Sequence, residues 1–166
     1  YCSDMTRTIF AGCILEKIKP VYDLVLKNLE NTTNEIKEYT EFKADEILQL
    51  YTQVGWTAYT EDMPALERGY KNSLLVLAAY ESGELLGIVR VVGDGTTIVL
   101  VQDILVYPAR QRQGIGTALL KAVLERYKNV RQIQLVTDNT PKTVAFYKSL
   151  GFLDFAEFGC CGFMRG

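Results

Sequence analysis

One short segment in the second half of the chain has the composition of an anion-binding turn. Residues 111–116 (QRQGIG) follow an apolar stretch that ends at Val106 and precede apolar residues at helical spacing. The first amides of a helix have no partners inside the helix, and the helix dipole favours negative charge beside them. The two glycines let the backbone approach a phosphate closely, and Arg110 and Arg112 can reach phosphate oxygens. The sequence therefore predicts a diphosphate-binding turn, with an ordinary tight turn as the simpler alternative.

Two familiar phosphate-binding loops do not match this segment. No Gly-Lys-Ser/Thr follows the glycines, so the segment is not a Walker loop. Leu119 stands where the dinucleotide fingerprint would have its third glycine, and the turn comes late in the chain. The predicted diphosphate-binding turn is therefore neither a Walker loop nor a dinucleotide-binding loop.

The composition excludes several kinds of site. The chain of 166 residues fits one domain, and its formal net charge of −2 argues against general nucleic-acid binding. No apolar stretch reaches the roughly 18 residues of a membrane span. The chain has no histidine, which excludes Ser–His–Asp catalysis and histidine zinc sites. Its four cysteines form no CxxC pair, so we expect no metal and a reducing, cytoplasmic location.

Hydrophobic periodicity predicts an α/β domain with a mixed central sheet. Residues 14–29 have helical spacing, and residues 30–34 form a polar linker. Gly151 suits the end of the last helix, and one cysteine of the adjacent Cys160–Cys161 pair should face the core. The elements expected after the linker are an edge strand in 35–42, helices over 44–54 and 63–72, strands over 74–80, 85–92 and 97–106, a helix from Gly114, a strand over 131–136, a helix from Thr140 to Leu150, and one or two strands within 152–163.

Two motifs in register resemble those of the GNAT superfamily of N-acetyltransferases. Residues 106–120 are similar to its acetyl-CoA motif, Gln/Arg-x-x-Gly-x-Gly/Ala, which Gln111, Gly114 and Gly116 satisfy. Residues 145–152 (AFYKSLGF) resemble its second motif, and residues 103–106 (DILV) resemble the strand that precedes the loop. The resemblance covers about residues 35–164. It implies a GNAT-like mixed sheet flanked by helices over 35–166, with residues 1–34 as an N-terminal extension, partly helical, that serves as a packing or homodimer element.

The resemblance implies transfer of an acetyl group from acetyl-CoA directly to a primary amine of a small molecule, an amino acid or a protein. The alternatives are a non-catalytic acyl-CoA-binding or sensing module and a pure interaction domain. In this family the pantetheine arm pairs with the strand before the loop, and amides of the loop hold the diphosphate. The residues that the resemblance assigns to the cofactor are Leu105, Val106, Gln111, Arg112, Gln113, Gly114, Ile115, Gly116, Thr117 and Asn139.

The resemblance also assigns a general acid, although it leaves the base open. Tyr147 matches the tyrosine that protonates the departing CoA thiolate, with a core-packing tyrosine as the alternative. Gln102 stands where many relatives have a glutamate, and an amide cannot act as a base. The remaining candidates are Asp103, Glu61 and Asp62, each of which could instead be a surface or structural carboxylate.

An acceptor pocket is expected near the first two helices. Trp56, Tyr59 and Glu61 fall in the region that lines the acceptor site in this family, and they suggest an amine with an apolar body. The alternative is packing between two short helices. Residues 54–56 (VGW) resemble a subgroup of the family that includes plant enzymes acting on arylalkylamines.

Overall fold

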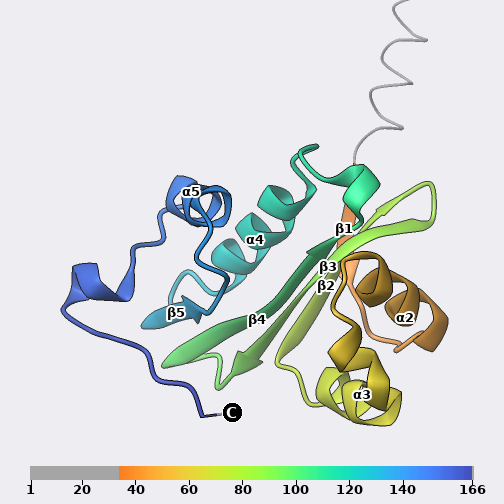
Figure 1. Ribbon diagram of the computed structural model, residues 1–166, viewed down its shortest axis with the longest axis horizontal. Helices are drawn as coiled ribbons and strands as arrows, with labels where there is room; N and C mark the ends of the chain where they lie inside the picture. Colours follow the sequence, from red (N-terminus) through yellow and green to blue (C-terminus); the bar gives the residue numbers. More distant parts are fainter. Residues whose placement is uncertain (1–33, 166) are drawn as a thin grey trace, which may run out of the picture.

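The computed structural model describes residues 34–165, which form a five-stranded sheet with helices on both faces (Figure 1). The helix expected within residues 14–29, and with it the extension at 1–34, falls almost entirely outside the described residues. The strands lie in the order β1-β2-β3-β4-β5. The elements are β1 (Glu35–Glu38), α2 (Ala44–Gln53), η1 (Thr57–Asp62), α3 (Met63–Lys71), β2 (Leu75–Glu81), β3 (Glu84–Gly93), β4 (Ile98–Val106), η2 (Pro108–Arg110), α4 (Ile115–Arg126), β5 (Gln132–Leu135), α5 (Pro141–Ser149) and η3 (Phe155–Phe158).

Helices cover the sheet on both sides, which confirms the predicted α/β class. Strands β1 to β4 pair antiparallel with their neighbours, whereas β4 and β5 are parallel. Helices α2 and α3 lie against one face, and α4 and α5 lie toward the other (Figure 1). Because both faces are covered, β2 is an almost continuous apolar run rather than an alternating one. Within residues 34–165, none of the helices combines the length and apolar character that crossing a membrane requires.

Strands β4 and β5 separate halfway along β4. Their pairing runs from Ile98 to Val101 on β4, and β4 then continues to Val106 with no described strand on that side. A bulge precedes this free portion, because Arg90 pairs with Asp103 and Val91 with Val101, which leaves Gln102 as an extra residue. The free edge therefore offers main-chain groups that can pair with an extended ligand.

The strands expected within residues 152–163 are not present, and this prediction was wrong. The segment instead forms the short helix η3, which begins with a capping box. The Asp154 side chain accepts a hydrogen bond from the Ala156 amide, and the Glu157 side chain accepts one from the Asp154 amide. Gly159 follows in the left-handed conformation, with φ of 69°. Cys160 and Cys161 are both exposed, so neither faces the core. Local capping outweighs the apolar alternation of this segment.

Candidate active site

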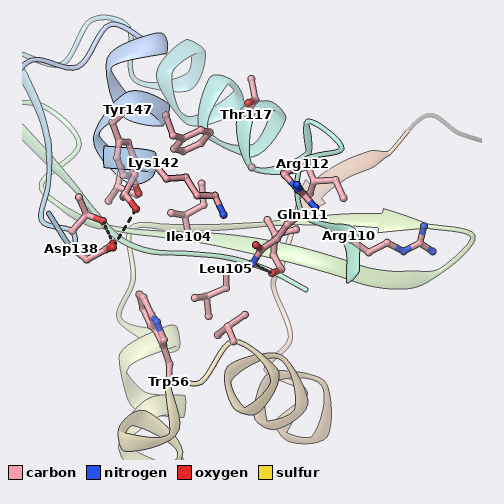
Figure 2. A pocket seen from close by; sticks show the side chains of 18 of the residues that line it. Trp56, Ile104, Leu105, Arg110, Gln111, Arg112, Thr117, Asp138, Lys142 and Tyr147 are labelled. Atoms are coloured by element: carbon pink, nitrogen blue, oxygen red, sulfur yellow. Dashed lines mark hydrogen bonds between the residues drawn. The ribbon is translucent and has the colours of Figure 1, made fainter. Parts of the chain in front are cut away.

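A cavity of about 580 Å³ opens where β4 and β5 separate (Figure 2). It lies between the free portion of β4, the turn into α4 and the start of α5, and Trp56 borders it from the α2 side. The lining residues are Val54, Trp56, Val101, Gln102, Ile104, Leu105, Val106, Arg110, Gln111, Arg112, Gly114, Ile115, Gly116, Thr117, Val136, Thr137, Asp138, Lys142, Thr143, Phe146 and Tyr147. Most of the residues that the sequence assigned to a cofactor therefore line one cavity.

The turn into α4 presents main-chain amides to this cavity. Gly114 has φ of 82° and is the N-cap of α4, and Arg112 has φ of 64°, a conformation that is uncommon outside glycine. The Gln111 side chain donates to the Val106 carbonyl at 3.2 Å, which ties the turn to the end of β4. Within the described chain, the amides of residues 112–117 have no hydrogen-bond partner. Together with the helix dipole they form a cradle for an anion.

Space for a ligand is kept open beside the first turn of α4. A Cβ built on Gly116 would meet Phe146, Val106 and Ile104 at 3.7, 3.8 and 3.9 Å. These are ordinary contacts, so the fold would accept alanine there. Gly116 lines the cavity, and a side chain longer than alanine would project into the space that a diphosphate needs.

Tyr147 is a buried residue of α5 that also lines the cavity. Its ring packs edge-to-face against Phe146 and Phe152, with centroids 5.0 and 5.9 Å away. Burial raises the pKa of the Tyr147 phenol, the nearby Asp138 carboxylate acts in the same direction, and a hydrogen bond with Thr137 opposes them. The phenol therefore stays protonated at neutral pH and can donate a hydrogen bond into the cavity.

Asp138 is the carboxylate among the lining residues, and the sequence reasoning missed it. It accepts hydrogen bonds from Thr137 Oγ1 at 3.1 Å and Thr143 Oγ1 at 3.3 Å (Figure 2). Desolvation raises its pKa, but hydrogen bonds from neighbouring threonine side chains together outweigh this effect, and the net pKa is lowered. The sequence offered one signal for Asp138, namely its position two residues before Thr140, the N-cap of α5. Asn139, which the sequence favoured, is exposed and lies outside the lining.

Asp103, a base candidate from the sequence, is buried away from the cavity lining at 1% exposure. Its Oδ2 accepts hydrogen bonds from Arg90 Nε and, at 2.9 Å, from the Tyr51 hydroxyl. The Tyr70 hydroxyl in turn donates to Tyr51 at 3.2 Å. Removing one partner of a buried ion pair typically costs about 3–5 kcal/mol. This environment assigns Asp103 to the core of the domain.

Trp56 and Tyr59 form an aromatic shelf on the side of the cavity opposite α5. Their rings stack with centroids 5.7 Å apart and an interplanar angle of 23°. The buried Tyr51 packs edge-on against Trp56, which fixes the shelf to the core. Trp56 is 39% exposed and borders the cavity, whereas Tyr59 is exposed and is not among the lining residues. Two other residues that the sequence assigned to the site, Gln113 and Glu61, are also exposed and are not among the lining residues.

Asp62 is the N-cap of α3, so a stability measurement can distinguish its role from that of the neighbouring Glu61. Its Oδ1 accepts a hydrogen bond from the Ala65 amide at 2.9 Å. Asp62→Ala should lower the free energy of unfolding by about 1 kcal/mol, measured by urea denaturation. Glu61→Ala, at an exposed site, should change it by less than about 0.5 kcal/mol and leave turnover intact. Loss of turnover in Glu61→Ala would restore Glu61 as a base candidate.

Comparisons with known proteins agree with this geometry. The model of the Acetyltransferase (GNAT) family matches residues 40–152. A solved GNAT family acetyltransferase from Streptococcus pneumoniae TIGR4 is 38% identical, with a TM-score of 0.72 over 80% of this chain and 97% of that chain. An uncharacterized N-acetyltransferase, ycf52, of Gracilaria tenuistipitata var. liui is 26% identical over 78% of this chain and 75% of that protein. Serotonin N-acetyltransferase 2, chloroplastic, of Oryza sativa subsp. japonica is 30% identical over 63% of this chain and 53% of that protein.

Proposed function

The chain belongs to the GNAT family of acetyltransferases, and from this premise we propose that it moves an acetyl group from acetyl-CoA directly to a primary amine. The observation that carries the proposal is the cavity itself, which joins an amide cradle, a free strand edge and a buried tyrosine. An acyl-CoA has a chemical group for each of them: a diphosphate, an extended amide-bearing arm and a thioester.

The residues present fit such a donor along its length. The amides of residues 113–117 would hold the diphosphate, and Arg112 would add a planar cation. The β4 edge at Leu105 and Val106 would pair with the amide groups of the pantetheine arm, as an added strand does. When bound, acetyl-CoA supplies the activated acyl group. In this arrangement the reacting end of the donor would lie between the β4 bulge and Tyr147.

Tyr147 would donate a hydrogen bond to the sulfur that leaves. Full proton transfer from a phenol to a thiolate is unfavourable at ordinary pKa values of about 10 and 8.5, and burial raises the pKa of Tyr147 further. We therefore assign Tyr147 the stabilisation of negative charge developing on sulfur. Its side chain remains protonated at neutral pH and can donate this hydrogen bond in each catalytic cycle.

Asp138 replaces Asp103 and Glu61 as the group proposed to act on the acceptor amine. An ammonium must lose a proton before it attacks a thioester. Gln102, at the β4 bulge, lines the cavity but can only orient the amine. Asp138 shares the cavity with Tyr147, and its lowered pKa keeps it ionised at neutral pH. It is suited to bind the incoming ammonium, whose proton would leave to solvent, because a carboxylate with a lowered pKa is a weak proton acceptor.

The aromatic shelf favours an acceptor with a flat apolar body. Apart from Asp138, the lining residues include no carboxylate that could pair with a second or third positive charge. A polyamine or an aminoglycoside would therefore lose hydration there without a matching ion pair. The serotonin N-acetyltransferase among the relatives is named for an arylalkylamine, which supports the same choice.

Trp56→Ala should raise KM for an arylalkylamine such as tryptamine by roughly three- to tenfold, because a contact between aromatic rings is lost. KM for ethylamine should stay unchanged, and Trp56→Phe should recover most of the loss. Steady-state assays of thiol release measure both. Phe158→Ala, a substitution of an exposed aromatic outside the cavity, serves as the control. Equal losses for both amines in Trp56→Ala would contradict the aromatic acceptor.

The proposed reaction is tested by calorimetry with acetyl-CoA, followed by thiol-release and mass-spectrometric product assays over a panel of amines. Binding together with an N-acetylated product supports the enzyme. Binding without turnover on any amine would favour the acyl-CoA-binding module instead. Absence of binding at millimolar acetyl-CoA would leave only an interaction domain.

A further inference from the structure

Lys142 is a cavity residue that neither the sequence motifs nor the proposed reaction uses. It is the second residue of α5, after Pro141, and its side chain is exposed. Figure 2 shows the side chain extending from α5 into the cavity, with its amino group directed toward the side formed by β4 and α4. Its position therefore places a positive charge inside the cavity, opposite the amide cradle.

The local electrostatics of α5 do not favour a lysine at this position. The N-terminal end of a helix is the positive end of its dipole, which repels a cation. The first turn of α5 contains no acidic residue, and no carboxylate in the described part of the chain forms an ion pair with Lys142. Lys148 in the last turn shows the favourable arrangement, since it lies at the negative end and pairs with Glu157 at 3.1 Å.

Lys142 has no ion-pair partner among the described carboxylates. Asp138 also lines the cavity, but the hydrogen bonds to its carboxylate come from Thr137 and Thr143 rather than from Lys142. Across the cavity, Arg110 is neutralised by Glu81 at 2.7 Å, whereas Arg112 forms no ion pair with any described residue. Two cations that form no ion pair with a described residue, Arg112 and Lys142, therefore border the same cavity from different elements. A site that breaks a local rule without internal compensation is typical of a ligand-binding position.

We propose that Lys142 donates to the diphosphate of the CoA donor from the α5 side and closes the anion cradle. The diphosphate then lies between the amides at the start of α4 and a lysine ammonium from α5. This inference rests on the proposed function, because it assumes a CoA-type donor in the cavity. It assigns Lys142 a positioning role in donor affinity, distinct from the chemistry assigned to Tyr147 and Asp138.

The test is calorimetry on the full chain with three probes: CoA, dephospho-CoA, which keeps the diphosphate, and pantetheine, which has none. Lys142→Met should weaken binding of CoA and dephospho-CoA by about tenfold and leave pantetheine unchanged, because one charge-assisted hydrogen bond is lost. Lys142→Arg should recover most of the affinity. Lys121→Met, which removes an exposed cation of α4 outside the lining, should change none of the three.

A second readout does not depend on affinity. CoA and dephospho-CoA should protect Lys142 from an amine-acylating reagent, as followed by peptide mass spectrometry, and pantetheine should not. Unchanged CoA affinity in Lys142→Met would overturn the proposal while the proposed function stands. If Lys142→Met weakened binding of CoA but not of dephospho-CoA, the proposal would be overturned, because Lys142 would then contact the 3′-phosphate rather than the diphosphate. Failure of the unmodified protein to bind CoA would overturn the proposed function as well.

Discussion

Replacing Gly114 with glutamate should weaken acetyl-CoA binding by more than about a hundredfold. Gly114 has φ of 82°, where a residue with a Cβ is strained by roughly 1–2 kcal/mol. The added carboxylate would also lie at the edge of the amide cradle, where a like charge facing the diphosphate costs several kcal/mol. Isothermal titration calorimetry with acetyl-CoA measures the loss.

The fold itself should survive this change, so that the loss reports on the cradle. A Cβ on Gly114 would meet no heavy atom within 4 Å. Gly114→Asn is the matched control, because asparagine tolerates the left-handed region and is neutral. It should keep acetyl-CoA affinity within about tenfold, with a thermal midpoint close to that of the glutamate variant. Normal acetyl-CoA binding by Gly114→Glu would contradict the placement of the diphosphate.

Tyr147→Phe should lower kcat by about a hundredfold or more, in the range that one positioned hydrogen-bond donor to a developing negative charge contributes. Acetyl-CoA affinity should be retained, because the ring that packs on Phe146 and Phe152 remains. The direction of the pKa shift sets the pH dependence. Burial raises the pKa of Tyr147 above its unfolded value of about 10. The phenol is therefore protonated and able to donate at lower pH, and it loses its proton only as pH rises through the raised pKa of the folded state.

Tyr127→Phe provides the same chemical change elsewhere. Tyr127 is partly buried at the end of α4 and does not line the cavity. Its variant should turn over at the normal rate, as followed by release of the CoA thiol under saturating substrates. If Tyr147→Phe also kept the normal rate, Tyr147 would be a packing residue and the donor would have to be sought elsewhere.

The parts of the site that sequence reasoning predicted are those whose geometry is set locally. The turn at residues 111–114 follows from glycine at a left-handed position and from the start of the next helix. The start of α5 follows from the Thr140 side chain, which accepts from the Thr143 amide, and from Pro141 in the first turn. Gly151 occupies the left-handed position just after α5, as expected. Each of these depends on contacts within about four residues.

The parts that escaped prediction depend on partners distant in the chain. Asp103 looked like a base because nothing in the sequence shows that Arg90 and Tyr51 lie beside it in the core. Asp138 and Lys142 enter the cavity only because α5 packs beside the point where β4 and β5 separate. In residues 152–163 the error was different, since capping of η3 outweighed an apolar alternation that suggested strands.

The most direct measurement is the response of individual main-chain amides to CoA, followed by ¹⁵N–¹H correlation spectra during a titration. If the amides at the start of α4 hold the diphosphate, those of residues 113–117 should shift most, and dephospho-CoA should produce the same pattern. Pantetheine should leave them nearly unchanged while it shifts residues of the β4 edge. Resonances of residues 113–117 that stay in place while CoA binds would show that the diphosphate lies elsewhere, and would contradict the proposed site.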